Sequence, residues 1–242
     1  MTSVWICLPT YNEIENLERM VHALGDQRTS HDLDLTVLVV DDGSPDGTGA
    51  EADRLAVELP WVRVLHRTSK DGLGRAYLAG FRAALDGGAD IVMEMDCDFS
   101  HDPADVVRLV AATEDADFVI GSRNVAGGGV RGWPWYRQVI SKGGSFYART
   151  ILRMRVRDMT AGFTAIRRRV LEQLDLDGID ASGYMFQVEL KYRTVRAGFR
   201  IREVPVTFID REYGESKMTG SIVLEAMWRV WLLRLRGVPA AR

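Results

Sequence analysis

Residues 91–98 read IVMEMDCD and give the clearest local indication of the fold. The first five of these residues are mostly apolar, a pattern typical of a buried strand, and two carboxylates follow at once. Similar apolar runs occupy residues 4–8, 35–40, 62–66 and 118–121, and helical patterns lie between them near residues 13–25, 47–59, 73–86 and 103–114. This repeated alternation predicts an α/β fold in which helices flank a mostly parallel central sheet.

Polar residues gather where these strands end. The segments after the first, second and fourth strands are residues 9–13, 41–44 and 96–98. Ligands of parallel sheets bind beyond the carboxyl ends of the strands, so we expect the functional site at this edge. Asp96 and Asp98 can approach one divalent cation if the chain turns at Phe99, and carboxylate oxygens suit Mg²⁺ or Mn²⁺. A coincidental pair of surface carboxylates is the alternative interpretation.

The turn after the second strand has the acidic spacing of a calcium loop between residues 42 and 53. Pro45 and Gly49 interrupt that pattern, and a strand precedes it instead of a helix, so we reject a calcium site. We expect Asp41 or Asp42 to project towards a ligand. Asp46 and Thr48 are candidate caps of the following helix.

Several functional classes are disfavoured. Tyr77 stands where a dinucleotide fingerprint beginning at Gly72 has its third glycine, so nicotinamide binding is not expected. Cys7 and Cys97 lack the spacing of a zinc or redox pair and are too few for a disulfide scaffold. There is no G-x-S-x-G elbow of a serine hydrolase. The sequence also shows neither a signal peptide nor an apolar stretch long enough to span a membrane.

The charge is distributed unevenly along the 242 residues. Residues 1–121 hold 23 acidic and 9 basic residues, whereas residues 122–242 hold 11 acidic and 22 basic ones. The basic excess is greatest between Arg123 and Asp158. This excess indicates either a solvated face that attracts the acidic half, or an anion site or a surface for anionic lipid or nucleic acid.

The second half continues with a glycine-rich stretch, residues 125–132, that we expect to form a loop. Helical patterns follow near residues 138–153, 167–174 and 184–197, with a strand near residues 201–208. The last helical pattern, residues 221–236, has a wide apolar arc that carries Trp228 and Trp231. That helix could lie in a membrane interface or dock on the core. We therefore divide the chain into one domain, residues 1–220, and an amphipathic helix and tail, residues 221–242, that faces a membrane or a partner.

Seven motifs occur in one order along the chain: LPTYNE at 8–13, VDDGSPDGT at 40–48, DGLGRAY at 71–77, MDCDFSHDP at 95–103, GSR at 121–123, DMTAGF at 158–163 and DREYGESKM at 210–218. Together they resemble the dolichol-phosphate (polyprenol-phosphate) mannose synthases, which are inverting family-2 glycosyltransferases. The resemblance covers roughly residues 4 to 220. It implies a single Rossmann-like domain with the glycosyltransferase A-type fold.

The resemblance also implies the reaction and its setting. Mannose would pass from GDP-mannose to a polyprenol (dolichol-type) monophosphate with inversion, with Mg²⁺ or Mn²⁺ as cofactor. The chain resembles the branch of the family without transmembrane helices of its own. Such a protein would bind peripherally at the cytoplasmic face of an anionic membrane, or rely on an integral membrane partner protein.

Roles for individual residues follow from the same resemblance. The nucleoside would be surrounded by Pro9, Tyr11, Glu13, Val40 and Asp42. The metal would be bound by Asp96 and Asp98, with Cys97 lining the sugar-nucleotide site and Ser100, or a water molecule, at the place of a third ligand. The donor phosphates would be held by Arg123, Arg211 and Lys217. The acceptor phosphate would lie near Ser141, Lys142, Arg123 and Arg137. The catalytic group would then be Asp96, Asp98, Arg123 and Lys142.

Three alternatives stay open at this point. The first is a polyprenol-phosphate glucosyltransferase or another transferase that uses a UDP-sugar, because spacing does not distinguish guanine from uracil. The second is a non-catalytic scaffold that retains the fold, although the pair Asp96 and Asp98 argues against it. The third is nucleic-acid binding, which we do not expect because the basic half contains no recognised reading motif.

Overall fold

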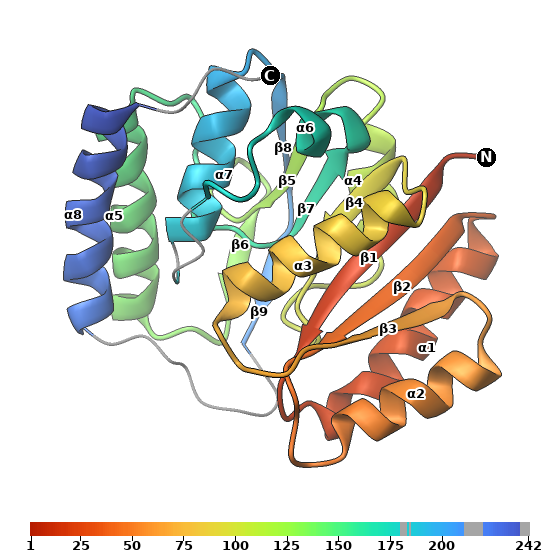
Figure 1. Cartoon of the computed structure of the whole chain (residues 1–242). Helices are drawn as coiled ribbons and strands as arrows, with labels where there is room; N and C mark the ends of the chain where they lie inside the picture. Colours follow the sequence, from red (N-terminus) through yellow and green to blue (C-terminus); the bar gives the residue numbers. More distant parts are fainter. Residues whose placement is uncertain (180–182, 184, 211–219, 238–242) are drawn as a thin grey trace.

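The computed structural model describes residues 1–179, 183, 185–210 and 220–237, and for residues 220–226 it describes the backbone only. In this part of the chain a seven-stranded sheet has the order β3-β2-β1-β4-β7-β5-β8 (Figure 1). Its strands are β1 (Ser3–Thr10), β2 (Asp34–Asp41), β3 (Val62–His66), β4 (Ile91–Glu94), β5 (Phe118–Ser122), β7 (Thr164–Arg167) and β8 (Ile201–Pro205). The predicted α/β class with a mostly parallel sheet is confirmed.

Helices cover both faces of this sheet. They are α1 (Ile14–Ser30), α2 (Thr48–Glu58), α3 (Leu73–Asp86), α4 (Asp105–Ala112), α5 (Trp135–Leu152), α6 (Arg168–Gln173), α7 (Met185–Arg196) and α8 (Gly220–Arg236). Side chains alternate between the faces, since Ile6 of β1 packs in one core cluster with α1 and α4, whereas the adjacent Cys7 packs in another with α3 and α6. Burial on both faces explains why these strands are almost continuously apolar.

Close packing fixes α3 over the sheet. A Cβ atom at Gly80 would lie 2.9 Å from the sulfur of Cys7 and 3.2 Å from a methyl group of Val40. The glycine therefore lets the backbone of α3 approach β1 and β2 more closely than any other residue would. This approach sets the height of α3, whose first turn contributes Leu73 to the site described below.

Three features differ from the sequence predictions. β7 was not predicted, and it pairs antiparallel with both β4 and β5. The expected loop at residues 125–132 contains a short strand, β6 (Gly129–Arg131). The single strand expected at residues 201–208 is two strands, because β8 ends at Pro205 and β9 (Thr207–Ile209) pairs with β6 in a separate two-stranded sheet.

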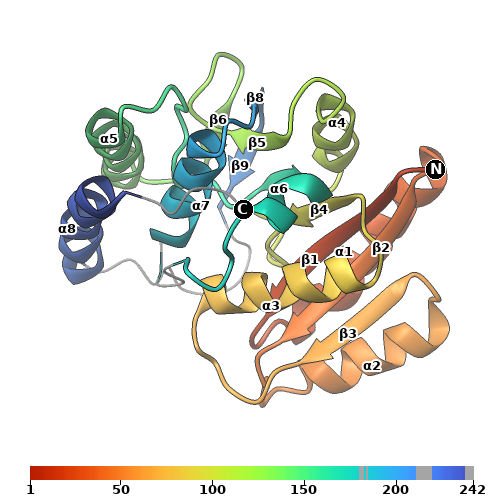
Figure 2. The same ribbon diagram turned by 45° about the horizontal axis from the view of Figure 1, so that its top comes forward.

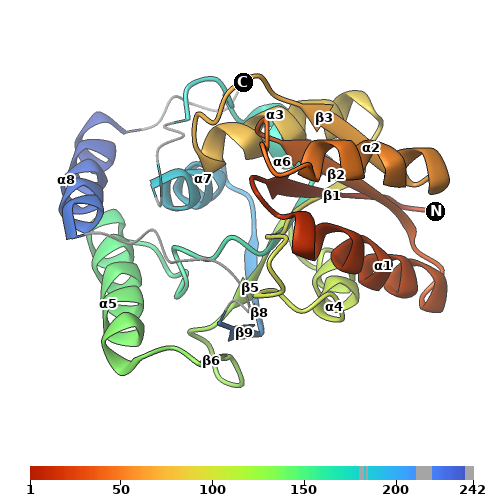
Figure 3. The same cartoon turned by 90° about the horizontal axis from the view of Figure 1, so that it is seen from below.

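The last helix lies beside α5 at the side of the molecule away from β2 and β3 (Figures 2 and 3). Val230 and Leu233 face inward and are buried, and the hydroxyl of Tyr147 on α5 donates to the carbonyl oxygen of Met227. Trp228 and Trp231 face outward, with 65% and 44% of their surfaces exposed. The helix therefore docks on the protein through one apolar stripe and leaves a second one uncovered. None of the helices described is both long enough and apolar enough to cross a membrane.

Candidate active site

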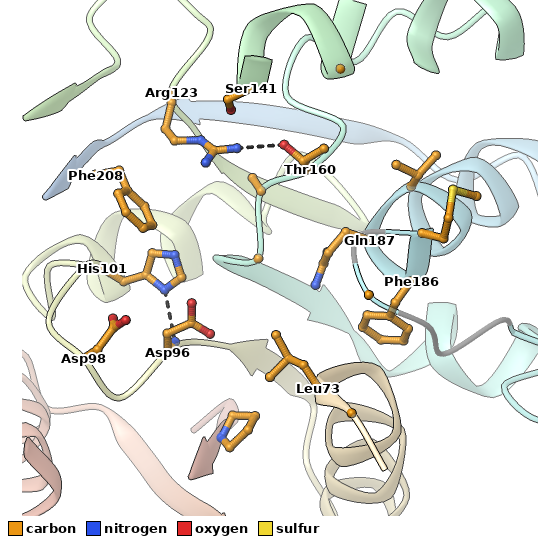
Figure 4. A pocket seen from close by; sticks show the side chains of 18 of the residues that line it. Leu73, Asp96, Asp98, His101, Arg123, Ser141, Thr160, Phe186, Gln187 and Phe208 are labelled. Carbon is orange, nitrogen blue, oxygen red and sulfur yellow. Dashed lines mark hydrogen bonds between the residues drawn. The ribbon is translucent and has the colours of Figure 1, made fainter. Parts of the chain in front are cut away.

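A cavity of about 510 Å³ lies beyond the carboxyl ends of β1 and β4 (Figure 4). One part of its wall is polar and comes from the strand ends, with Glu13, Asp42, Asp96 and Asp98 among its residues. The opposite part is apolar and comes from three helices. Its residues include Ile140, Tyr147, Met185, Met227 and Val230. The cavity thus offers one end suited to a charged, hydroxyl-rich ligand and another suited to a hydrocarbon chain.

The turn that follows β4 holds the two carboxylates. Phe99 has a φ of 59°, the left-handed conformation that is uncommon outside glycine, so the turn that a shared cation would require is present. The hydroxyl of Tyr77 donates to Asp96 over 3.1 Å, and Asp98 accepts from the backbone N–H of Ser100 over 3.0 Å. Burial, together with the neighbouring Asp96, raises the pKa of Tyr77 well above its ordinary value. The phenol therefore stays protonated and remains a donor to Asp96.

His101 completes this turn. Its Nδ1 accepts the backbone N–H of Asp96 over 3.1 Å (Figure 4). Its ring stacks on Phe163 and makes an edge-to-face contact with Phe208. The imidazole is buried and lines the cavity. No role was predicted for His101, although it belongs to the motif at residues 95–103. Its position five residues after Asp96 is the feature of the sequence that could have indicated a contact with this turn.

The same turn suits a divalent cation. Asp96 and Asp98 both line the cavity, and the buried hydroxyl oxygen of Ser100 has no hydrogen-bond partner among the residues described. Unlike the carboxylates, Ser100 does not line the cavity, but its backbone N–H donates to Asp98, so it belongs to the same turn. The two carboxylates suit a hard cation such as Mg²⁺ or Mn²⁺. No group of three or more His, Cys, Asp or Glu side chains in the described ranges is arranged to hold a metal ion. The two carboxylates would therefore share a cation with Ser100, water or substrate oxygens.

The two aspartates in the turn after β2 have different roles, one in holding the turn and one in lining the cavity. Asp41 accepts from the backbone N–H groups of Gly43 and Ser44 and from the hydroxyl of Thr10, so it holds the turn together. Asp42 lines the cavity and pairs with Arg67. Burial raises the pKa of Asp42, and the Arg67 guanidinium opposes that rise without cancelling it. Of the two candidates, Asp42 is the residue at the cavity.

The N-cap of α2 is Gly47, so neither predicted residue occupies that position, but Asp46 and Thr48 link α2 to α1. Asp46 accepts from the backbone N–H of Thr48, the first residue of α2, over 3.0 Å and from that of Ile14, the first residue of α1. The hydroxyl of Thr48 in turn accepts from the backbone N–H of Glu13. This arrangement holds Glu13 and Tyr11 at the cavity, where the ammonium of Lys70 lies 3.3 Å from the centre of the Tyr11 ring.

Arg123 reaches the cavity from the end of β5. Its Nε and Nη2 donate to the two oxygens of the fully buried Asp158 over 2.8 and 2.7 Å, and Nη2 also donates to the hydroxyl of Thr160 (Figure 4). Burial alone would raise the pKa of Asp158, but the hydrogen bonds and the charge of Arg123 outweigh it and lower that pKa. The guanidinium is thus fixed in orientation at the cavity wall.

The residues predicted around the acceptor phosphate separate on α5. Ser141 and Arg137 line the cavity, and Arg137 pairs with Asp210 over 2.8 Å and stacks over the ring of Trp133. Lys142 does not line the cavity and is exposed. One position along a helix turns a side chain by about 100°, which carries Lys142 away from the face that bears Ser141.

The remaining predicted residues have three outcomes. Pro9, Tyr11, Glu13 and Cys97 line the cavity together with the carboxylates. The side chain of Val40 lies in the hydrophobic core under α3 instead of at the cavity. Arg211 and Lys217, and with them most of the 210–218 motif, lie outside the described residues.

Comparisons with known proteins give the family. The model "Glycosyl transferase family 2" matches residues 5–175, and the chain belongs to this family. An undecaprenyl-phosphate mannosyltransferase of Micrococcus luteus is 52% identical, with coverage of 95% of this chain and 93% of that one. A polyprenol monophosphomannose synthase of Mycolicibacterium smegmatis is 50% identical, with coverage of 96% and 87%. The expected resemblance to polyprenol-phosphate mannose synthases is confirmed.

A solved structure shows the same fold. Glucosyl-3-phosphoglycerate synthase of Mycobacterium tuberculosis, in complex with Mn²⁺, UDP-glucose and phosphoglyceric acid, superposes with a TM-score of 0.71 at 22% identity. The alignment covers 98% of this chain and 81% of that one. The predicted glycosyltransferase A-type domain is therefore confirmed as the fold.

Proposed function

We propose that this enzyme transfers mannose from GDP-mannose to a polyprenol monophosphate with inversion at the anomeric carbon. The observation that carries the proposal is the two-part cavity, whose acidic end adjoins an apolar end between α5, α7 and α8. A sugar nucleotide with its cation suits the first end, and the start of an isoprenoid chain suits the second. The names of the two relatives at 50% and 52% identity support mannose as the transferred sugar and a polyprenyl phosphate as the acceptor.

The chemistry needs little help from a general base. An oxygen of the lipid phosphate forms the bond to the anomeric carbon while the bond from that carbon to the β-phosphate oxygen of GDP breaks. Because the phosphate is already an anion, no proton has to be removed from the nucleophile. A divalent cation held by Asp96 and Asp98 would supply positive charge to the departing diphosphate. Arg137 and Ser141, which line the cavity, would hold the acceptor phosphate, and Arg123 lines the same cavity.

The protein would meet its acceptor at the cytoplasmic face of a membrane through the outward side of α5 and α8. This α5–α8 face consists of the exposed residues Trp135, Tyr136, Val139, Ile140, Phe146, Met227, Trp228, Trp231 and Leu235. Ile140 and Met227 also line the cavity, so the face and the cavity adjoin. Tryptophan and tyrosine favour membrane interfaces, and three exposed arginines, Arg153, Arg155 and Arg157, follow α5. An integral membrane partner that covers this face is the alternative occupant.

Donor identity is tested by transfer from several sugar nucleotides to a polyprenyl phosphate in detergent. We expect mannosyl lipid and GDP from GDP-mannose, and transfer at least about a hundredfold lower for Asp98→Ala, since a major electrostatic contribution is lost. Chelation with EDTA should stop transfer, and Mg²⁺ or Mn²⁺ should restore it. Preferential transfer from UDP-glucose would identify a glucosyltransferase instead. Binding of GDP without any transfer would favour a scaffold.

Membrane contact is tested with vesicles of equal parts phosphatidylglycerol and phosphatidylcholine. We expect the wild type to sediment with them, less so as salt rises, because surface charges are screened within about 10 Å at 0.1 M salt. Replacing Trp228 and Trp231 together by serine should weaken binding strongly. The control Val57→Ser changes a still more exposed apolar residue on α2, away from this face, and should have no effect. If the double tryptophan variant binds the vesicles as well as Val57→Ser and the wild type do, the α5–α8 face would instead be assigned to a partner protein.

A further inference from the structure

Helix α7 carries charged and amide side chains that are buried in the protein interior although they are polar. Gln187, Glu189, Lys191 and Arg193 alternate along it, and each is at most 7% exposed. Residues four apart lie on one side of a helix, so the four residues make two separate pairs. Glu189 pairs with Arg193, which also donates to the carbonyl oxygens of Asp175 and Gly178. Gln187 pairs with Lys191 on the side that faces the cavity floor, which is the segment of residues 160–162.

Lys191 is fully buried, and its ammonium group has three acceptors. Nζ donates to the carbonyl oxygen of Ala161 over 2.7 Å, to the side-chain oxygen of Gln187 over 2.8 Å and to the carbonyl oxygen of Gln187 over 3.3 Å. Burial lowers the pKa of Lys191 to about 8, so the ammonium form, with its three protons, still predominates at pH 7. Ala161 and its neighbours Thr160 and Gly162 line the cavity. The lysine is therefore tied directly to the cavity floor from beneath.

The contact with Gln187 extends this link to the strand that carries the carboxylates. Because the oxygen of the Gln187 amide accepts from Lys191, its nitrogen is left to donate, and it donates to Glu94 over 2.8 Å. Glu94 also accepts from the hydroxyl of Thr164 over 2.6 Å and is the last residue of β4, two positions before Asp96. The amide itself lines the cavity (Figure 4). One chain of hydrogen bonds thus joins α7, the cavity floor and the end of β4.

We propose that Lys191 is a positioning residue for glycosyl transfer, which holds the floor at Ala161 and, through the Gln187 amide, the end of β4 in the arrangement that the reacting sugar requires. The proposal rests on the transferase function proposed above. Displacements of about 1 Å in an active site can cost a hundredfold in rate, and we expect an effect on kcat of ten- to a hundredfold.

The test compares Lys191→Met with Arg193→Met in the full chain. Both changes remove a buried cation from the same helix, but the contacts of Arg193 are with Glu189, Asp175 and Gly178, none of which lines the cavity. Each variant is measured for its urea midpoint, for GDP binding by calorimetry, and for kcat and KM with GDP-mannose and polyprenyl phosphate. We expect both to lose stability, both to bind GDP within threefold of the wild type, and only Lys191→Met to lose kcat.

An equal kcat for the two variants, each measured well below its unfolding midpoint, would overturn the positioning role. If Lys191→Met does not fold, Gln187→Met breaks the same link without removing the cation, and an unchanged kcat in that variant would overturn the proposal equally. The wild type and Arg193→Met report on the transferase function itself. An absence of transfer in both, with GDP binding retained, would refute that function and with it the role of Lys191.

Discussion

The Arg123–Asp158 pair offers the sharpest test of how the site is held together. Asp158 is fully buried and accepts three hydrogen bonds from Arg123, from its backbone N–H, Nε and Nη2, over 3.0, 2.8 and 2.7 Å. Asp158→Asn keeps the size of the side chain but removes its charge. One of the two oxygens becomes an NH₂ group, which would face a guanidinium or backbone N–H. The guanidinium then loses the charge of Asp158 and must face a neutral amide at the cavity wall.

The expected cost follows from the burial of both partners. Breaking a buried ion pair by removing one charge costs about 3–5 kcal/mol, because the other charge stays desolvated. Since the Arg123 side chain keeps 11% of its surface exposed, we expect the lower end, about 3 kcal/mol. Replacing Asp115, which pairs with Arg202 at the surface over 3.0 Å, by asparagine should cost at most about 1 kcal/mol.

The same pair predicts a dependence on pH. The pKa of Asp158 is lower in the folded protein than its unfolded value of 3.8. Its contribution is therefore fully present above that value and is lost as pH falls through the lower, folded pKa. The difference in unfolding free energy between the wild type and Asp158→Asn should be constant from pH 5 to 8 and should shrink below about pH 4.

Urea unfolding of the three proteins measures both effects. A loss below about 1 kcal/mol for Asp158→Asn at pH 7, or a loss equal to that of Asp115→Asn, would refute the reasoning, because it would place the pair in the weak class of surface bridges. A stability difference that grows on acidification would contradict the sign derived from the pKa of Asp158.

Two further predictions concern helix packing and the acceptor. In urea unfolding, Gly80→Ala should destabilise the protein by about 1–3 kcal/mol, because the added Cβ atom would meet Cys7. Gly143→Ala in α5 should stabilise it by about 0.4–1 kcal/mol, because no atom lies within 4 Å of the added Cβ atom. In transfer kinetics, Arg137→Ala should raise the KM for polyprenyl phosphate more than Lys142→Ala does, because only Arg137 lines the cavity. Equal changes in stability for the two glycine variants would contradict the packing described for α3. Equal changes in KM for Arg137→Ala and Lys142→Ala would contradict the placement of these residues on α5.

Part of the fold follows from local sequence because burial on both faces leaves an unmistakable apolar run. The first three of the four residues of Ile91–Glu94 form such a run, and all four are buried. β7 is equally short but gives no comparable signal, since only two residues of Thr164–Arg167 are apolar. It becomes a strand because β4 and β5 present their edges to it. β6 and β9 likewise exist only because each pairs with the other.

The candidate site shows a similar limit. The carboxylates of Asp96 and Asp98 could be placed from sequence, since strand ends of a parallel sheet meet at one edge. The separation of Ser141 from Lys142 required the helical phase of α5, which residue types alone do not fix. Lys191 gave no signal, because a lysine in a helix is normally exposed. Its burial depends on acceptors that lie 4 and 30 positions away in sequence.

The cavity and the α5–α8 face share side chains, and this sharing has a kinetic consequence. Ile140 and Met227 belong to both, so an acceptor could pass from the bilayer to the cavity along the two helices without its hydrocarbon chain entering water. On the membrane contact proposed above, detaching the protein from the bilayer would remove access to the lipid while leaving the strand-end half of the cavity intact. We therefore expect the double change at Trp228 and Trp231 to raise the KM for vesicle-borne polyprenyl phosphate and to leave the KM for GDP-mannose unchanged. Equal increases in both would show that α8 supports the donor half as well, and that the helix acts on the fold of the cavity instead of on its access.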